Sequence, residues 1–388
     1  MKILLIDPIG TGHHQEYTML LAEGLRALGG QTFFFGAASL LQALSSASLI
    51  YDGMPYAELH FDSNFLNNEL VRLRFFEDSI LALKKVNPGI GHFLYMDRFM
   101  ISAVLDRIMA RKKNALCATL HAVYFLPAFA PTAAHKIKGS IDFAALQFLA
   151  KRGMRTMIHS QKITSSLAEI TGLQKFDYVP YPVRSFNVTE QDKDMLRRKL
   201  RHELSLGPQD ILILVFGGTR YDKGADLAIK MLSLLPAHYH LLFAGRDTYF
   251  PRRELEGIAS AHSLDGRVHF DNRFIPDEDV AYYFCGCDIV LIPYRKSFSG
   301  QSGPLTIAAF FGTKIVAPNL PILEETMVEN ALGSVFFVEN INSMADAVEK
   351  AVKLPPRSSA VGFYNQHRPE SFARAVFESY TKAITDLK

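Results

Sequence analysis

Two cationic side chains stand three residues apart in a glycine-rich stretch in the second half of the chain. Arg220 and Lys223 lie in the sequence Gly-Gly-Thr-Arg-Tyr-Asp-Lys-Gly, residues 217–224, between an apolar run and a helical pattern. A helix N-terminus exposes backbone N–H groups, and arginine and lysine add positive charge and further donors. The pattern predicts an anion-binding loop. The plainer alternative is a solvated turn whose charges are incidental.

A second loop of small residues follows the apolar run that ends at Ile292. Pro304 opens the next helical pattern, where its missing N–H group is not needed. Small side chains let a backbone approach a phosphate closely. The residues concerned are Ser299, Gly300, Gln301, Ser302 and Gly303. By itself this loop is better explained by ordinary helix capping, but two anion-binding loops on one sheet suit a diphosphate.

Strand-like and helix-like segments alternate along the whole chain. In the first half, short apolar runs occupy residues 2–6, 32–35, 115–120, 155–159 and 176–179. In the second half they occupy residues 211–216, 240–244, 268–270, 289–293 and 314–317. Strands that alternate with helices predict parallel sheets covered on both faces. We therefore expect an α/β protein with two doubly wound, Rossmann-like domains.

The boundary between these domains is expected at the closely spaced prolines of residues 180–183, because they favour an extended connection. We assign residues 1–183 to the N-terminal domain and residues 184–368 to the C-terminal domain. The amphipathic helix 369–388 is expected to pack back on the N-terminal domain. Ligands of open α/β sheets bind beyond the carboxyl ends of the strands, so two facing domains would form a cleft lined by strand-end loops.

Charge and cysteine content exclude several classes of protein. The formal net charge of +3 over 388 residues is too small to indicate nucleic acid as a partner, although residues 1–185 hold 19 Lys/Arg against 14 Asp/Glu. No apolar run approaches the roughly 20 residues that span a bilayer, and no signal peptide is recognisable. Three cysteines favour a reducing cytoplasm, and burial explains Cys285 and Cys287 better than metal binding does.

Over residues 176–340 the chain resembles the retaining family 4 glycosyltransferases of the GT-B fold. The stretch FGxxRxxKG, residues 216–224, is similar to their first donor-phosphate loop. The stretch from PYR to QSG, residues 293–303, with Gly312 and the run 315–317 behind it, is similar to a variant of their second donor loop. In the first half, support comes from the Gly10–Gly12 loop, His121 at a strand end, and the connection at residues 180–183.

The resemblance implies a role for each matching residue. Arg220 and Lys223 would neutralise the donor diphosphate and the charge that develops as it departs. Gly12 would let the N-terminal loop approach the donor, and His121 would hydrogen-bond the donor sugar near the reacting carbon. The residues implied to hold the phosphates are Ser299, Gly300, Gln301, Ser302 and Gly303, and those beside the nucleobase are Phe274, Ile275 and Pro276. No metal or other cofactor is expected, because the family does not need one.

The chain departs from the family pattern around the second loop. Most members carry two glutamates there, and the corresponding positions are Ser299 and Ile307. The first glutamate usually lies near the donor sugar, and the second usually holds the ribose hydroxyls. The sequence therefore predicts a phosphate-binding site more clearly than it predicts which nucleotide or which sugar is bound.

Two further groups of residues are candidates for binding. His13, His14 and Glu16 follow the first glycine loop and are expected to contact the acceptor or the donor sugar, although an acid is also favoured in a first helical turn. Residues 69–113 mix basic with aromatic side chains, which suits an anionic membrane surface or a lipid-linked acceptor. Acids are interspersed, and the basic run 111–113 also fits a helix C-terminus. His121 has an alternative too, as a histidine satisfied within the core.

These observations and the resemblance predict an enzyme that transfers a hexose from a UDP- or GDP-sugar, with retention, to a glycan or lipid-linked acceptor. The N-terminal domain would bind the acceptor and the C-terminal domain the nucleotide sugar. The expected setting is bacterial surface polysaccharide or glycolipid assembly, in the cytoplasm or on the inner face of the membrane. Two alternatives stay open: a nucleotide-sugar epimerase on a similar scaffold, and a non-catalytic nucleotide-sugar-binding partner, which Ser299 and Ile307 favour.

Overall fold

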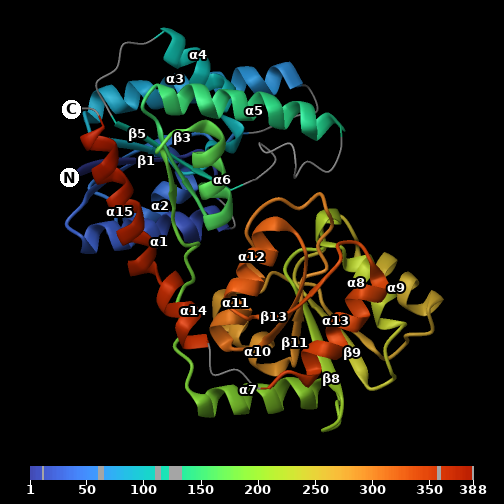
Figure 1. The fold of residues 1–388 in the computed structure, drawn as a ribbon. Coiled ribbons are helices and arrows are strands. Elements are labelled where there is room, and N and C mark those ends of the chain that lie inside the picture. Colours follow the sequence, from blue (N-terminus) through green and yellow to red (C-terminus); the bar gives the residue numbers. More distant parts are fainter. Residues whose placement is uncertain (11–12, 60–64, 110–114, 122–132, 356–359, 387–388) are drawn as a thin grey trace. The chain divides into compact units, whose positions relative to one another are not determined.

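The computed structural model describes residues 1–10, 13–59, 65–109, 115–121, 133–355 and 360–386 (Figure 1). Gly12 and the basic run 111–113 lie outside the described residues, as do the side chains of His13 and Arg98. The chain forms two compact units. The first unit comprises Met1–Pro182 and Gln366–Lys388, and the second unit comprises Val183–Asn365.

The first unit is built on a seven-stranded parallel sheet in the order β3-β2-β1-β4-β5-β6-β7. Its strands are β1 (Lys2–Asp7), β2 (Gln31–Ala37), β3 (Asp52–Tyr56), β4 (Ile90–Phe93), β5 (Ala115–Leu120), β6 (Arg155–Ile158) and β7 (Phe176–Tyr178). Its helices are α1 (His13–Ala27), α2 (Ala38–Ser46), α3 (Phe65–Val86), η1 (Met96–Arg98), α4 (Met100–Met109), α5 (Ala133–Lys151), α6 (Gln161–Thr171) and α15 (Pro369–Thr385).

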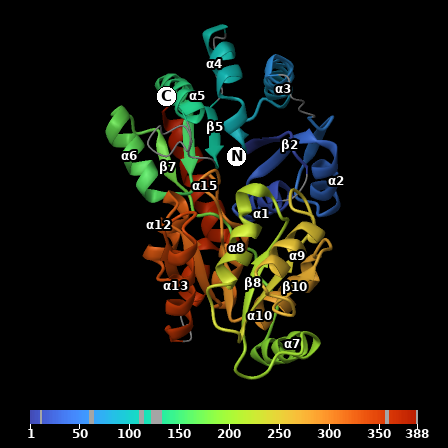
Figure 2. The same ribbon diagram turned by 90° about the vertical axis from the view of Figure 1, so that its right-hand side faces the viewer.

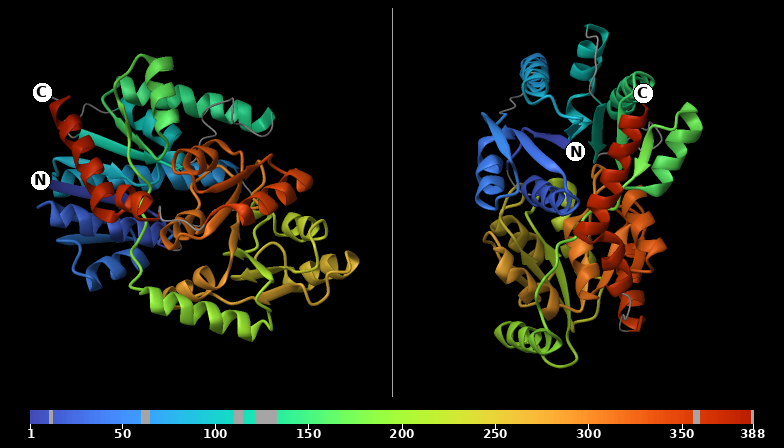
Figure 3. Two further views of the ribbon diagram at one scale, coloured as in Figure 1. Left: turned by 60° about the horizontal axis from the view of Figure 1, so that its bottom comes forward. Right: turned by 90° about the vertical axis from the view of Figure 1, so that its left-hand side faces the viewer.

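Helices cover both faces of this sheet because the strand order reverses direction at β1. Right-handed crossovers place α1 and α2 on one face and α3 to α6 on the other (Figure 1). The last helix, α15, returns to the first unit and packs against α1 (Figure 3). A Cβ atom at Gly24 of α1 would lie only 2.3 Å from Ala373 Cβ of α15, so glycine there permits the close helix packing.

The second unit repeats this architecture with a six-stranded parallel sheet in the order β10-β9-β8-β11-β12-β13. Its strands are β8 (Ile211–Phe216), β9 (Tyr239–Ala244), β10 (Val268–Asp271), β11 (Ile289–Leu291), β12 (Lys314–Pro318) and β13 (Gly333–Phe336). Its helices are α7 (Glu190–Glu203), η3 (Tyr221–Lys223), α8 (Ala225–Leu232), α9 (Arg252–Ala261), η4 (Asp277–Asp279), α10 (Val280–Gly286), α11 (Gly303–Phe311), α12 (Pro321–Glu329) and α13 (Ile341–Lys353); α14 (Ala360–His367) leads back to the first unit.

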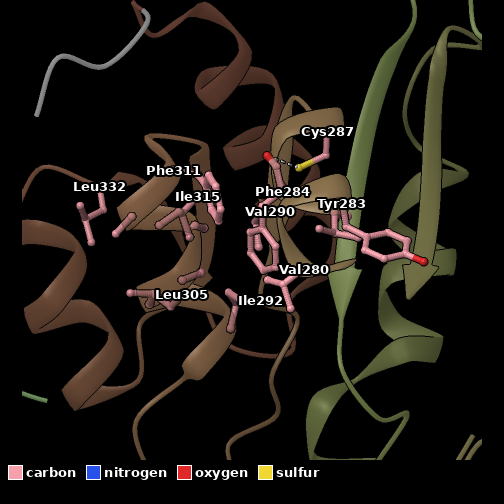
Figure 4. Close-up of a cluster of buried hydrophobic side chains, with 14 of the residues drawn as sticks. Val280, Tyr283, Phe284, Cys287, Val290, Ile292, Leu305, Phe311, Ile315 and Leu332 are labelled. Carbon is pink, nitrogen blue, oxygen red and sulfur yellow. Dashed lines mark hydrogen bonds between the residues drawn. The ribbon is translucent and has the colours of Figure 1, made fainter. Parts of the chain in front are cut away.

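The second sheet has a hydrophobic core on each face. One core lies under α8, α9 and α13, and the other lies under α10, α11 and α12, with α7 packed on α10 (Figure 2). Phe284, Val290 and Ile315 belong to the second of these cores (Figure 4). Cys287 is buried there and its thiol donates to the carbonyl oxygen of Phe284 at 3.6 Å, while burial raises its pKa well above the usual value. Cys285 is half-buried.

The predicted α/β class with two doubly wound sheets is confirmed, but the sequence analysis missed three strands. The central strand β4 reads Ile-Gly-His-Phe, and its glycine and histidine conceal the apolar run. A Cβ atom at Gly91 would lie 2.4 Å from Cδ2 of Leu83 in α3, so a larger residue would have to displace that side chain. His92 is buried between Tyr380 Oη and Thr119 Oγ1, at 2.7 and 2.8 Å from its two ring nitrogens. The edge strands β3 and β13 are short and only partly buried.

Candidate functional site

The first cationic loop lies at the carboxyl edge of the second sheet, directly after β8. Two glycines with positive φ frame it, Gly217 at 98° and Gly224 at 64°. A Cβ atom at Gly224 would lie 2.0 Å from the carbonyl oxygen of Pro293, so only glycine lets this loop rest against the loop after β11. The structure therefore brings the two loops predicted from the sequence into direct contact.

The two cations of the first loop are held differently. Arg220 donates to both oxygens of Asp222, from Nε at 2.9 Å and Nη2 at 2.6 Å, and this pairing raises its pKa. Its side chain is 50% exposed. Lys223 Nζ lies 5.7 Å from the centre of the Tyr294 ring and close to Gly217. Among the described residues Lys223 forms no ion pair, so it is the cation of this loop that an anion meets without competition from a carboxylate.

A third cation, Arg295, fastens the second loop to the first. It is buried, and its Nη2 donates to Asp226 Oδ1 at 2.5 Å. Its Nε donates to the carbonyl oxygen of Tyr221 at 3.0 Å, and its guanidinium lies 4.3 Å over the ring of the same tyrosine. Its backbone N–H donates to the carbonyl oxygen of Asp222 at 2.9 Å. The sequence analysis quoted Arg295 within a motif but gave it no role.

The second loop ends in a capped helix. Ser302 is the N-cap of α11, and its Oγ accepts from the backbone N–H of Leu305 at 3.3 Å and lies 3.2 Å from Tyr294 Oη. Its side chain is buried by these contacts. The other residues predicted to hold phosphate are partly exposed at the helix N-terminus, namely Ser299, Gly300, Gln301 and Gly303. Ile307 packs against the core beneath α11, so it does not replace the usual glutamate with another polar group.

A third loop, after β9, is tied to the first loop by Thr219. Its buried hydroxyl donates to the carbonyl oxygen of Phe250 at 2.7 Å and accepts from the backbone N–H of Thr248 at 3.0 Å. Next along the edge, after β10, lie the three residues predicted beside the nucleobase. Phe274 is 62% exposed, whereas the Ile275 side chain is buried in the core and Pro276 precedes η4. Ile275 can therefore offer only its backbone to a ligand.

In the first unit, His121 follows β5 with a fixed orientation. Its backbone N–H is 3.1 Å from both oxygens of Asp97, and its Nε2 donates to the carbonyl oxygen of Leu94 at 3.0 Å. The imidazole stacks on Tyr95, with 3.9 Å between ring centres. Because the carbonyl can only accept, Nε2 carries a proton.

His14, in the first turn of α1, stacks on the same tyrosine, with 3.5 Å between ring centres. Its Nδ1 lies 3.2 Å from each oxygen of Asp7, which is buried at the end of β1. Burial raises the pKa of Asp7, although the bond to His14 opposes the shift. Glu16 is exposed. The structure thus brings His14 and His121 together on Tyr95. The sequence analysis missed Asp7, and it counted Tyr95 among the aromatic residues of segment 69–113 that suited a membrane surface.

Among the described residues, no group of three or more His, Cys, Asp or Glu side chains is placed to hold a metal ion. In the same part of the chain, no helix is long and apolar enough to cross a bilayer.

Residues 210–353 match the protein family described as "Glycosyl transferases group 1". This segment lies within the second unit and contains both cationic loops. No curated protein sequence is significantly similar to the chain.

Several solved structures share the whole fold at low sequence identity. Sucrose-phosphate synthase from Thermosynechococcus elongatus has a TM-score of 0.75 at 16% identity, with 99% of each chain covered. HepE from Anabaena, solved in complex with UDP, has a TM-score of 0.73 at 14% identity, covering 98% of this chain and 100% of HepE. A glycosyltransferase from Rickettsia africae has a TM-score of 0.71 at 16% identity, covering 99% of this chain and 98% of that one.

At such identities the likeness shows the fold, which is the GT-B fold of glycosyltransferases with its two Rossmann-like domains. On this fold, residues 210–353 of the second unit are similar to group 1 glycosyltransferases, and the chain is an enzyme of the transferase class.

Proposed function

We propose that this enzyme transfers a hexose, with retention, from a UDP- or GDP-sugar to a glycan or lipid-linked acceptor. The observation that carries the proposal is the meeting of two loops at one sheet edge, with Lys223 and Arg220 in the first and the N-terminus of α11 behind the second. Both loops lie in the segment that matches the glycosyltransferase family. HepE structures contain UDP and UDP-glucose, which supports a nucleotide-sugar donor.

The chemistry follows from the cations. When the bond between the sugar's anomeric carbon and the diphosphate oxygen breaks, negative charge grows on the departing diphosphate. Lys223, without a carboxylate partner in the described part of the chain, stabilises that charge, and Arg220 shares its guanidinium between Asp222 and phosphate. The acceptor hydroxyl attacks the same face of the sugar, and its proton passes to the leaving oxygen. No metal is invoked, because the two cations supply the charge that a metal would supply.

The first unit would bind the acceptor and orient the donor sugar. His121, whose Nε2 donates to the carbonyl oxygen of Leu94, is the side chain that we propose lies near the reacting carbon of the donor sugar. Asp7 aligns His14 beside it, through Nδ1. Gly12, His13 and Glu16 remain proposed contacts of the same region, and Glu16 is exposed.

We further propose that the first unit touches an anionic membrane surface. Large apolar side chains project from the three neighbouring helices α3, α4 and α5, spaced so that those of each helix share one side. They are Leu70, Leu81, Ile101, Leu105, Ile137 and Ile141, each at least 40% exposed. Lys84 and Lys85 end α3. WaaG, a solved neighbour with a TM-score of 0.63, is described as a glycosyltransferase of lipopolysaccharide biosynthesis, which supports a role in bacterial surface glycolipid or polysaccharide assembly.

Sedimentation with lipid vesicles tests the membrane contact. We expect the protein to pellet with phosphatidylglycerol vesicles and to stay in solution with phosphatidylcholine vesicles. The double variant I137S/I141S should lose the pelleting, and Val328→Ser, at an exposed position of the second unit, should keep it. If both variants pelleted equally, the exposed apolar side chains of these helices would not form the membrane contact.

A panel of UDP- and GDP-sugars tests the transferase. Release of nucleoside diphosphate is followed with and without glycan and lipid-linked acceptors, and NMR of the product reports the anomeric configuration. The proposal predicts release that depends on Lys223 and a product with the anomeric configuration of the donor. An inverted product would overturn the retention, and no binding of any donor would overturn the function.

A second candidate, a nucleotide-sugar-binding partner without catalysis, is favoured by the apolar packing of Ile307 and by Ser299 in place of the usual acids. Calorimetry that shows donor binding, with no transfer across the whole acceptor panel, would establish it instead.

A further inference from the structure

Three neighbouring strands of the second sheet end at the same level. Phe216 of β8 pairs with Ala244 of β9, and Ala244 pairs with Asp271 of β10. The loops after these strands therefore start side by side along one edge. A Cβ atom at Gly245, just after β9, would lie 2.5 Å from the carbonyl oxygen of Gly217, so the loop after β9 touches the phosphate loop.

Arg246, the next residue, differs from the other arginines of this edge in its interaction partners. Arg220 is held by Asp222, Arg295 by Asp226, and Arg273 by Asp271 and Asp279. Among the described residues Arg246 forms no ion pair. It is exposed, and its guanidinium lies 4.9 Å over the ring of Phe274, which belongs to the neighbouring loop.

This arrangement leaves the N–H donors of Arg246 without a carboxylate partner among the described residues. A cation over an aromatic face is held by the ring's charge distribution, while its N–H groups point outward from the rim. The backbone that carries it is anchored, because the N–H of Thr219 donates to the carbonyl oxygen of Arg246 at 3.2 Å. An arginine that is fixed in place and not neutralised by an acid is suited to bind an acceptor-rich ligand.

We propose that Arg246, stacked on Phe274, selects the nucleobase of the donor; this rests on the proposed function of the same edge. Two strand spacings, about 10 Å, separate the loop after β10 from the phosphate loop. That distance is comparable with the reach of a nucleoside from its phosphate to its base. The guanidinium has five N–H donors and no acceptor. It therefore favours the carbonyl that uracil carries at C4 and guanine at C6 over the amino group that cytosine and adenine carry at those positions.

Calorimetric titration of UDP, GDP, CDP, ADP and inorganic pyrophosphate tests the selection. The wild-type protein should bind UDP or GDP about tenfold or more tighter than CDP and ADP. Arg246→Ala should reduce that difference to about twofold while changing the affinity for pyrophosphate little. The control Arg253→Ala removes another exposed cation, from α9, and should keep the difference.

Two results would overturn the assignment of Arg246. One is an equal loss of affinity for all four nucleotides and pyrophosphate in Arg246→Ala, since that would show a general effect of charge. The other is an unchanged ranking of the nucleotides. If Lys223→Ala abolishes nucleotide binding but Arg246→Ala leaves the ranking of the nucleotides unchanged, only this inference fails. If the wild-type protein binds no nucleotide, the proposed function fails as well. Both substituted arginines are exposed, so the variants are expected to fold.

Discussion

Replacement of Arg295 by alanine is expected to loosen the loop that grips phosphate, although Arg295 itself is buried behind it. The change removes the ion pair with Asp226, the bond to the Tyr221 carbonyl oxygen and the contact with the Tyr221 ring. Asp226 stays behind with its side chain only 10% exposed. Lys230 Nζ, 3.6 Å from the other carboxylate oxygen, compensates only in part.

Breaking a buried ion pair from one side typically costs 3–5 kcal/mol, because a charge is left without its partner. The remaining Lys230 places Arg295→Ala at the lower end, so we expect the second unit to lose about 3 kcal/mol of unfolding free energy. UDP affinity should fall too, because Tyr221 and Lys223 lie in the released turn.

Guanidinium denaturation followed by circular dichroism measures the loss, with each unfolding transition fitted separately. The double variant D226N/R295A provides the decisive comparison. It leaves no buried charge, so it should be more stable than the sum of the two single effects predicts. A loss below about 1 kcal/mol for Arg295→Ala, or strict additivity in the double variant, would refute the role given to this pair.

Three further predictions concern single residues. Gly224→Ala should destabilise the second unit strongly, since its Cβ would lie 2.0 Å from Pro293 O, whereas thermal unfolding of Gly257→Ala, with open space around it, should show no loss. Ser302→Ala should cost about 1 kcal/mol in denaturant unfolding, as the N-cap of α11 is lost. Burial lowers the pKa of His159 to about 4, so the unfolded chain binds its proton first as pH falls from about 6.5. His159 should account for about 3 kcal/mol of the stability lost down to pH 4; buried His92, with its pKa lowered to about 3, adds to the same fall, so His159→Asn should flatten it in part.

The alternation of strands and helices was predictable because most central strands are continuous apolar runs. Strand β8, for example, is Ile-Leu-Ile-Leu-Val-Phe. Strand β4 was not predictable from its own residues. Gly91 leaves room for Leu83 of α3, and His92 hydrogen-bonds to Thr119 of β5 and Tyr380 of α15. These requirements come from tertiary packing, which no local pattern of residues expresses.

The residues of the candidate site also divide into those that the local sequence reveals and those that depend on tertiary contacts. Arg220 and Lys223 were recognisable because their glycines and the following helix are local in sequence. From the sequence alone, Arg295 could not be distinguished from an arginine that binds phosphate, because its ion-pair partner Asp226 is 69 residues away. Burial of the Ile275 side chain likewise depends on the core beneath α10. Asp7 is recognisable as a site residue only once the first turn of α1 is seen to place His14 beside it.

Titration of UDP and GDP into the wild-type protein and Lys223→Ala tests the central claim most directly, that the second unit grips a diphosphate. Lys353→Ala is the control, because it removes an exposed cation from the last turn of α13, which runs away from the carboxyl edge. The account predicts that Lys223→Ala weakens nucleotide binding tenfold or more, as expected for loss of about 1.5–3 kcal/mol in a charged contact, and that Lys353→Ala binds like the wild type. Equal affinities for Lys223→Ala and Lys353→Ala would contradict it.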